Sequence, residues 1–263
     1  MANPFQSAGS VFSAVDSSGD TGELAKRLKI IAELPGMQLA RERAYERLEP
    51  LRDAAVLDLG CGIGEDVAAL RVRGANSIGL DASLALITIA RSKHSETTFI
   101  VGDAGNLPFT TASLDGILAN RVLMHLAQPD QVLEECFRCL RRDGTLAAIE
   151  PIWQRLTISG DASVSRVVER SFGTAIRNAQ LGENIADVFA GAAFIRVSVE
   201  VVPVNIWGWQ NADAALGIHT ALQRAVLNGD IPEKIAASWA SAAARSDEFC
   251  ASVPLCVASG ARP

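Results

Sequence analysis

Between residues 55 and 150, short apolar runs alternate with stretches of helical periodicity, and this alternation limits the fold more than any other feature of the sequence. Helical patterns occupy residues 65–74, 83–93 and 129–144. We expect strands at the five apolar runs, which are 55–59, 77–81, 98–102, 114–119 and 144–150. Because strands joined by short crossover helices pair in parallel, the pattern predicts an α/β fold built on a doubly wound sheet.

Two later segments extend this sheet. Residues 194–207 alternate like a sixth strand, and residues 249–260 are expected to form a seventh. Pro203 and Pro254 interrupt the two runs, and since proline has no N–H to donate, each strand is expected to lie at an edge or to break there. Residues 211–247, between the two strands, are Ala-rich with a helical pattern.

The stretch "VLDLGCGIGED", residues 56–66, places three glycines at alternate positions between the first strand and the next helix. A dinucleotide-binding turn needs the order G-x-G-x-x-G/A, but here the third glycine comes one position early and Glu65 stands in its place. Glu65 and Asp66 also put two carboxylates at the helix end that would otherwise attract a phosphate. The turn therefore favours a positively charged nucleoside over a pyrophosphate.

Acidic residues follow three successive strands of the predicted sheet. Asp58 lies in the first strand, Asp81 ends the second, and Asp103 follows the third. A carboxylate at Asp81 could accept hydrogen bonds from both hydroxyls of a ribose. Asp103 could accept from the amino group of adenine, with the Ala104 N–H available for a ring nitrogen. Each acid alone could instead serve local turn bonding, but three at successive strand ends favour a nucleoside site.

These stretches, together with "LDGILANRVLMHLAQPDQVLEECFRCLRRDGTLAAIEP", resemble in order and spacing the motifs of class I S-adenosylmethionine-dependent methyltransferases. The resemblance is to the branch that contains ubiquinone, menaquinone and natural-product methyltransferases, and it is close over residues 55–151. It implies a Rossmann-like, seven-stranded sheet that is mostly parallel with an antiparallel last strand, and S-adenosylmethionine as the cofactor.

The resemblance also implies roles for individual residues. It makes Asp58 the acid of the first motif and places Asn120 beside the methionine moiety and the transferable methyl group. One of Gln38, Arg41 and Arg43 in the N-terminal helices could hold the methionine carboxylate. The remaining contacts implied are the methionine and ribose for Gly60, Cys61 and Gly62, the ribose for Asp81, the adenine face for Ala82, and the adenine edge for Asp103 and Ala104.

The chain has no evident nucleophilic triad, and in-line methyl transfer to an aligned acceptor does not need one. His125 follows the fourth strand and is the candidate general base, because an imidazole with an ordinary pKa of about 6.5 suits proton removal near neutrality. The alternative is a structural histidine that bonds to the backbone. Arg121 and Glu150 could orient an acceptor or pair locally.

Added helices are expected to roof the carboxyl edge of the sheet, where ligands bind in open α/β folds. We divide the chain, as one compact domain, into N-terminal cap helices (1–50), a cofactor-binding Rossmann-like core (51–151), inserted cap helices (152–193) and C-terminal strands with a helical insert (194–263). The alternative is that the added helices merely cover apolar surface.

A net charge of −6 without a dense Lys/Arg cluster argues against nucleic acid as a partner. We expect a cytoplasmic protein with no membrane partner, because neither a signal pattern nor a run of about 18 apolar residues is present. Five cysteines form no disulfide framework, and Cys136 and Cys139 are expected to pack in a helix rather than bind a metal. The oligomeric state stays open.

The predicted function is methyl transfer from S-adenosylmethionine to an O, N or C nucleophile of a small molecule, of the kind found in secondary metabolism and natural-product biosynthesis. Two alternatives remain. A protein of this fold could keep the cofactor and act as a cyclase or binding protein. An NAD-dependent oxidoreductase is opposed by the glycine spacing and by Glu65.

Overall fold

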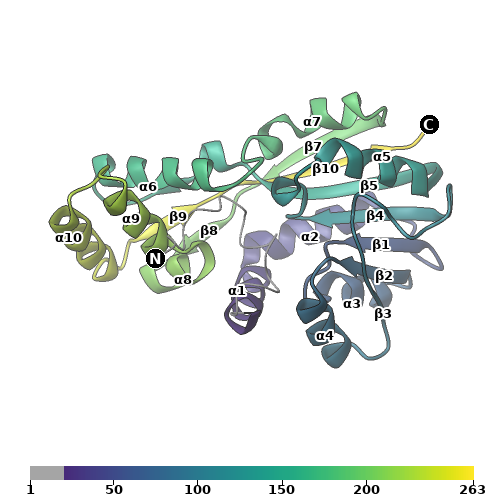
Figure 1. The fold of residues 1–263 in the computed structure, drawn as a ribbon, viewed down its shortest axis with the longest axis horizontal. Helices are drawn as coiled ribbons and strands as arrows, with labels where there is room; N and C mark the ends of the chain where they lie inside the picture. The colour runs from purple at the N-terminus through teal and green to yellow at the C-terminus, as the bar shows by residue number, and fades with distance from the viewer. Residues whose placement is uncertain (1–20) are drawn as a thin grey trace, which may run out of the picture.

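The computed structural model describes residues 21–263, in which seven strands form a main sheet (Figure 1). Strands β1 to β5 pair in parallel, while β10 runs antiparallel to its neighbours β5 and β7. This order confirms the predicted α/β class with an antiparallel last strand. In spatial order the strands are β3 (Thr98–Val101), β2 (Asn76–Asp81), β1 (Ala55–Leu59), β4 (Leu114–Asn120), β5 (Leu140–Pro151), β10 (Leu255–Ala261) and β7 (Ile195–Val202).

Helices cover both faces of this sheet (Figure 1). One face carries α2 (Pro35–Arg47), α3 (Glu65–Val72) and α4 (Leu84–Lys93). The other carries α5 (Pro129–Cys139) and α7 (Leu181–Gly191). The two-sided cover explains why the strands read as nearly continuous apolar runs in the sequence.

Neighbouring residues of each strand pack into opposite halves of the core, as the twofold periodicity of a strand requires. Val56 and Leu118 belong to the apolar cluster that includes α2. Leu57 and Ile117, one position away in each strand, belong to the cluster that includes α5 and α7. All four side chains are buried, so the sheet is held from both sides.

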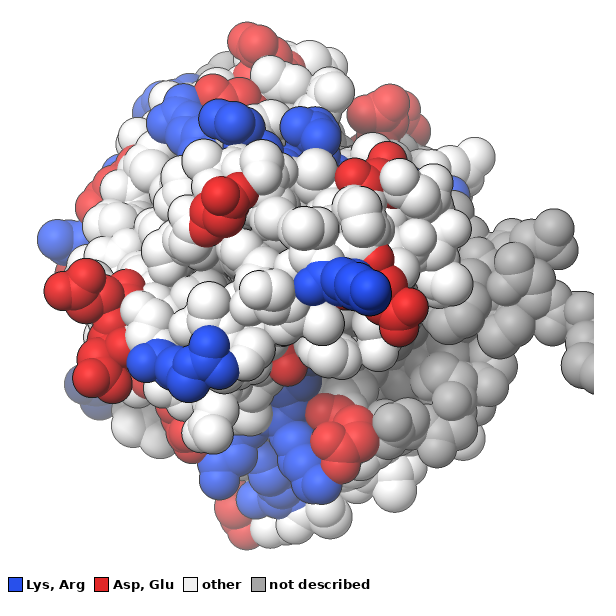
Figure 2. Space-filling view, turned by 90° about the vertical axis from the view of Figure 1, so that its left-hand side faces the viewer, with Lys and Arg blue, Asp and Glu red and all other residues white. Residues whose placement is uncertain are grey.

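A smaller, antiparallel sheet of β6 (Thr157–Ile158), β9 (Cys250–Ser252) and β8 (Asn205–Trp207) lies at one end of the molecule. The helices around it are α6 (Ala162–Ala175), α8 (Trp209–Leu216), α9 (Ile218–Leu227) and α10 (Glu233–Ala244). We call these elements the cap. On the face of the cap end shown in Figure 2, charged residues of both signs are scattered among uncharged ones.

The two late strands predicted from sequence both divide at their prolines. The run 194–207 becomes β7 and β8 on either side of Pro203, and the run 249–260 becomes β9 and β10 on either side of Pro254. The first run thus passes from the main sheet to the small sheet, and the second passes back from the small sheet to the main sheet, each where proline interrupts the ladder. The two crossings are tied together by the Val253 N–H, which donates to the Val204 carbonyl at 3.0 Å.

The expected helix at 129–144 was too long, because α5 ends at Cys139 and β5 begins at the next residue. The intervening residues are strand because their backbone pairs elsewhere: Asp143 N–H donates to Arg262 O, and Arg262 N–H donates to Gly144 O, both at 2.9 Å. Cys136 and Cys139 are buried and unbridged, which confirms that they pack.

The expected cap segments separate into two kinds of helix. Residues 1–20 of the N-terminal segment lie outside the described residues. Helix α1 (Thr21–Glu33) contacts α4 and α8, whereas α2 lies on the main sheet. Likewise α6 belongs to the cap, while α7 covers the main sheet. None of the helices within residues 21–263 has the length and apolarity needed to span a bilayer.

Candidate functional site

The glycine turn between β1 and α3 uses the left-handed backbone region at all three glycines, with φ of 67°, 53° and 84° at Gly60, Gly62 and Gly64. A Cβ at Gly64 would lie 2.6 Å from the Phe99 ring, and one at Gly60 would overlap Val122. Packing therefore requires glycine at the two ends of the turn. Within residues 21–263, a Cβ at Gly62 would meet only Leu28, at 3.5 Å, so these residues leave the backbone of Gly62 open to a close approach.

Asp81, at the end of β2, is joined to the glycine turn. Its Oδ2 accepts a hydrogen bond from the Gly62 N–H and its Oδ1 accepts from the Ser83 N–H, both at 2.9 Å. Ala82, between them, is exposed. The structure thus brings the expected ribose ligand against the expected methionine-binding turn.

Cys61 contributes its backbone to the turn, because its side chain is buried in the apolar cluster with Val67 and Phe99. Its N–H donates to Leu80 O at 3.0 Å, and burial raises the pKa of its thiol. We therefore assign no chemistry to this sulfur.

Asp103 and Ala104 lie just past the end of β3. The exposed Asp103 side chain accepts a hydrogen bond from the Gly105 N–H at 2.9 Å through Oδ1, which is the local turn bond considered as an alternative role. Ala104 is half-buried. Both remain predicted ligands of the adenine edge.

Two buried side-chain oxygen atoms of the neighbouring strands β1 and β4 accept no hydrogen bond from the residues that the structure describes. They are Asp58 Oδ2 and Asn120 Oδ1. Burial and the nearby Asp66 raise the pKa of the Asp58 carboxyl well above its ordinary value. Since a buried acceptor left unpaired is costly, these atoms favour a ligand that brings N–H donors and positive charge.

Asp66 organises this edge through three partners that no sequence motif indicates. It accepts hydrogen bonds from Arg41 Nε at 2.6 Å, from Asn120 Nδ2 at 2.9 Å and from the Tyr45 hydroxyl. Its neighbour Glu65 pairs with Lys93 Nζ at 2.9 Å.

The expected repulsion of a phosphate by two free carboxylates was therefore wrong, because both carboxylates at the start of α3 are already paired. The glycine spacing is the argument against a dinucleotide that remains. Of the three candidates for the methionine carboxylate, Arg41 lies in the Asp66 cluster. Arg43 pairs instead with Glu46 and Glu200, and Gln38 is exposed.

The segment after β4 is held by a buried carboxylate. Glu150 Oε1 accepts from the N–H groups of Val122 at 3.0 Å and Leu123 at 2.7 Å, at the start of a short 3-10 helix, Leu123–His125. Burial raises the pKa of Glu150 to about 8. From the opposite side, Asn178 Nδ2 donates to two carbonyls of the same segment, Leu123 O and Leu126 O.

Comparison with known proteins identifies the domain that carries this edge. Residues 57–148 match a family described as "Methyltransferase domain". A "Demethylmenaquinone methyltransferase" of Thermotoga maritima is 39% identical over 113 residues, which cover 42% of this chain and 49% of that protein. Residues 57–148 are a class I methyltransferase domain that depends on S-adenosylmethionine.

A second relative matches a larger part of this chain, but its name does not describe an enzyme. The "Uncharacterized 37.1 kDa protein in transposon TN4556" of Streptomyces fradiae is 33% identical over 217 residues, which cover 80% of this chain and 63% of that protein. This chain thus spans less than two thirds of either relative's length.

Solved structures share the fold of this chain. The phosphoethanolamine N-methyltransferase 2 of Haemonchus contortus, in complex with S-adenosyl-L-methionine, has a TM-score of 0.62 at 19% identity and covers 97% of this chain and 60% of its own. The [4+2]-cyclase SpnF has a TM-score of 0.54 at 18% identity, covering 86% and 80%. At these identities the likeness concerns the fold alone.

His125 is half-buried and ends the short 3-10 helix, Leu123–His125, whose first N–H donates to Glu150. Burial and the nearby Arg121 lower the pKa of its imidazole to about 4, so the ring is neutral at neutral pH. His94 is half-buried beside Gly64, and His219 is exposed on the cap.

Two tryptophans of the cap end pack against aromatic rings. Trp153 stacks on Phe172 with ring centroids 5.6 Å apart, and Trp209 lies edge-on to Phe249 at 5.4 Å. Trp207 is 61% exposed. Ordinary packing therefore accounts for Trp153 and Trp209.

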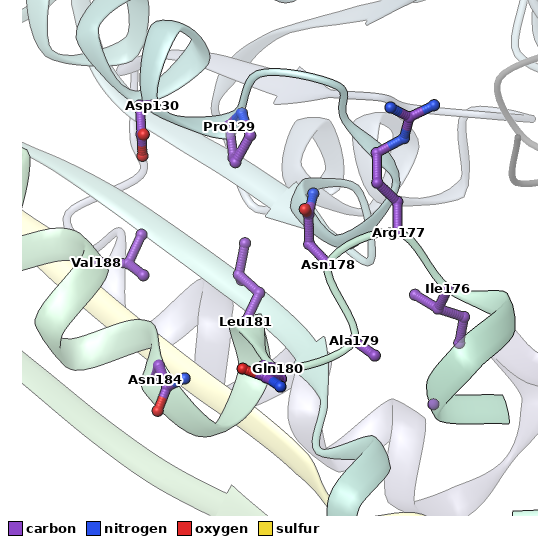
Figure 3. A pocket seen from close by; sticks show the side chains of 11 residues that line it. Pro129, Asp130, Ile176, Arg177, Asn178, Ala179, Gln180, Leu181, Asn184 and Val188 are labelled. Atoms are coloured by element: carbon purple, nitrogen blue, oxygen red, sulfur yellow. The ribbon is translucent and has the colours of Figure 1, made fainter. Parts of the chain in front are cut away.

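A groove of about 380 Å³ runs between the start of α5 and the connection from α6 to α7 (Figure 3). Its lining residues come from 129–130, 173, 176–181, 184 and 188. None of the predicted cofactor ligands of the methyltransferase domain lines it. Asn178 lines the groove and donates a hydrogen bond to Leu123 O in the 120–126 segment. The groove therefore lies next to that segment and not among the predicted cofactor ligands.

Proposed function

We propose that this protein transfers the methyl group of S-adenosylmethionine to a small-molecule acceptor. The observation that carries the proposal is the pair of buried, donor-free acceptors, Asp58 Oδ2 and Asn120 Oδ1, beside the open backbone at Gly62. A methionine ammonium supplies both N–H donors and positive charge, which is what these atoms lack. These two acceptor atoms therefore fit the methionine ammonium of the cofactor that the domain family uses.

The rest of the nucleoside fits the neighbouring strand ends. Asp81 would accept from the ribose hydroxyls while Gly60, Cys61 and Gly62 present their backbone. Ala82 would contact the adenine face, and Asp103 with the Ala104 N–H would bind its edge. The Asp81 to Gly62 hydrogen bond supports this arrangement, because it already holds the ribose ligand and the methionine turn together.

The bound cofactor would supply an activated methyl group on a sulfonium. The chain's part is to align the acceptor, and alignment of two reacting groups is worth about 7–11 kcal/mol of barrier in well-oriented systems. His125 would take a proton from a hydroxyl or amine acceptor. Its neutral ring can accept a proton, but a lowered pKa makes it a weak base.

We propose a small-molecule acceptor, and we extend the proposal to secondary metabolism or natural-product biosynthesis. The small-molecule acceptor is supported by the relative named "Demethylmenaquinone methyltransferase", which matches 42% of the chain. The fold likeness to the cyclase SpnF supports an alternative in which the cofactor is kept and its methyl group is not moved. The methyltransferase hypothesis is favoured because the family match is to transferases.

One assay distinguishes methyl transfer from the cyclase or binding role. The purified protein is incubated with S-adenosylmethionine and a panel of phenols, amines, carboxylic acids and quinols, and S-adenosylhomocysteine is measured by mass spectrometry. Formation with one acceptor, reduced by Asp81→Ala, supports methyl transfer. Binding of S-adenosylmethionine without S-adenosylhomocysteine from any acceptor favours the cyclase or binding role, and absence of binding refutes both.

A further inference from the structure

Arg121 is a shielded cation without a partner. Within residues 21–263 its guanidinium makes neither a hydrogen bond nor an ion pair, and its Nε is closed to solvent although the residue as a whole keeps partial exposure. Leaving a buried charge uncompensated costs several kcal/mol, so most proteins pair such a group. An unpaired guanidinium at a ligand-binding edge therefore points to an anion that arrives with a ligand.

The acids near Arg121 make their hydrogen bonds to other groups. The charged groups that act on Arg121 are Asp66, Glu150, Arg41 and Arg27. Asp66 accepts from three donors, and Glu150 Oε1 accepts from two backbone N–H groups, while Glu150 Oε2 has no partner among the described residues. Burial raises the pKa of Glu150 to about 8, and Arg27 is also acted on by Asp213. Three guanidinium groups therefore act on one another at this edge of a chain that is acidic overall.

The backbone conformation of Arg121 is unusual and is held by hydrogen bonds. The φ of Arg121 is 58°, in the left-handed region that residues other than glycine rarely adopt, and its N–H donates to Ile149 O at 2.7 Å. The next two N–H groups are held by Glu150. Strain of this kind persists only where the surroundings impose it, and it is common at functional sites.

Arg121 follows Asn120, the predicted contact of the methionine moiety, and lies on the far side of it from the predicted ribose and adenine contacts. Those contacts gather at the ends of β1, β2 and β3, whereas Arg121 follows β4, which pairs with β5. On the same side, Arg27 of α1 donates through Nε to Ala215 O of the cap helix α8 at 3.0 Å. The two arginines therefore lie between the core and the cap, where an acceptor would have to enter.

We propose that Arg121 binds a carboxylate of the methyl acceptor. A guanidinium presents a planar fork of donors that matches a carboxylate in two parallel hydrogen bonds, and desolvation strengthens such a pair. Arg27 adds a second positive charge nearby. The inference rests on the proposed function, and it narrows the acceptor to an acid.

The test uses the full-length protein loaded with S-adenosylhomocysteine and titrated calorimetrically with matched acids and amides. The pairs are benzoate and benzamide, 4-hydroxybenzoate and 4-hydroxybenzamide, indole-3-acetate and indole-3-acetamide, and hexanoate and hexanamide. In at least one pair the acid is expected to bind about tenfold more tightly than its amide, as for a charge-assisted hydrogen bond. Arg121→Gln should abolish this preference by weakening the acid alone, and Arg121→Lys should retain part of it.

Arg196→Gln is the matched control, because Arg196 also has a positive φ, of 52°, but pairs with Asp143 on the surface. It should leave the acid preference unchanged. The unfolding temperature of Arg121→Gln should equal or exceed that of the wild type, because the variant removes an unpaired charge. A marked decrease would instead indicate a structural role for Arg121 and overturn the proposal.

Three binding results would also overturn it. They are the lack of an acid preference in all four pairs, a preference that survives Arg121→Gln, and a tenfold loss of S-adenosylhomocysteine affinity in Arg121→Gln. The last would show that the anion is the carboxylate of the cofactor. If the wild type fails to bind S-adenosylhomocysteine, the proposed function fails as well, which separates that failure from a failure of the Arg121 assignment alone.

Discussion

Asp66 joins three elements at the cofactor edge through its hydrogen bonds to Arg41 and Tyr45 of α2 and to Asn120 of β4. The side chains of Arg41 and Asp66 are 15% and 12% exposed, so their attraction is little screened by water. The residue therefore stabilises the position of the N-terminal helix against the motif strands.

Replacing Asp66 by Asn should cost about 3 kcal/mol of unfolding free energy, because Arg41 is left as a buried charge without its partner. Urea unfolding measures the change. Glu65→Gln is the control, since its ion pair with Lys93 is more exposed and should contribute less than about 1 kcal/mol. Equal losses in the two variants would contradict this assignment.

Glu150 should make stability depend on pH. Because burial raises its pKa to about 8, the folded state holds a proton that the unfolded state releases between the ordinary carboxyl pKa and that value. Stability therefore falls as pH rises through this window, by up to about 1.4 kcal/mol per pH unit from this group. Glu150→Gln should remove that contribution in urea unfolding from about pH 5 to 8. An unchanged pH dependence would show that Glu150 is ionised throughout.

Some side-chain contacts of this site could be predicted from the sequence, and others could not. The contact between Asp81 and the glycine turn follows from motifs at adjacent strand ends. The pairing of Asp66 does not, because Arg41 stands 25 residues away in a helix whose packing on the sheet has no local signal. Glu150 was a candidate for orienting an acceptor, whereas the structure uses one of its oxygens to hold the backbone.

At the level of elements, the long periodic segments were predictable and the short ones were not. Strands β1 to β4 lie within one residue of the predicted runs at each end, because their two-sided burial makes them continuous and apolar. The cap strands β6, β8 and β9 span only two or three residues, too few to show alternation. The strand breaks at Pro203 and Pro254 were predicted because proline removes a ladder donor.

Helix α1 covers the glycine turn. Leu24 packs with Ile63 and Leu86, and Leu28 is the neighbour nearest to the Cβ position of Gly62. Leu28→Ala should therefore speed the dissociation of S-adenosylhomocysteine severalfold, measured by stopped-flow displacement, with little change in the unfolding temperature. Leu227→Ala, at a residue that is 73% exposed in the cap, should leave the rate unchanged. An unaltered rate in Leu28→Ala would mean that α1 does not retain the ligand.

At the scale of the whole molecule, four chain crossings link the core and the cap within residues 21–263. They lie between β5 and β6, between α6 and α7, at Pro203 and at Pro254. Helix α1 adds a further link, because it contacts α4 of the core and α8 of the cap. The carboxyl edge of the main sheet faces this junction. A ligand at that edge would bind the folded state alone and raise its stability, by about 2.7 kcal/mol at a hundredfold excess over its Kd.

Calorimetric titration of the full-length protein with S-adenosylhomocysteine tests the central claim, that this edge binds the cofactor of the methyltransferase family. The account predicts one saturable site per chain, an affinity lowered about tenfold or more by Asp81→Ala, which removes acceptors for the ribose, and no effect of Asp187→Ala on the exposed surface of α7. No saturable binding, binding of NAD in its place, or an affinity indifferent to Asp81→Ala would contradict it.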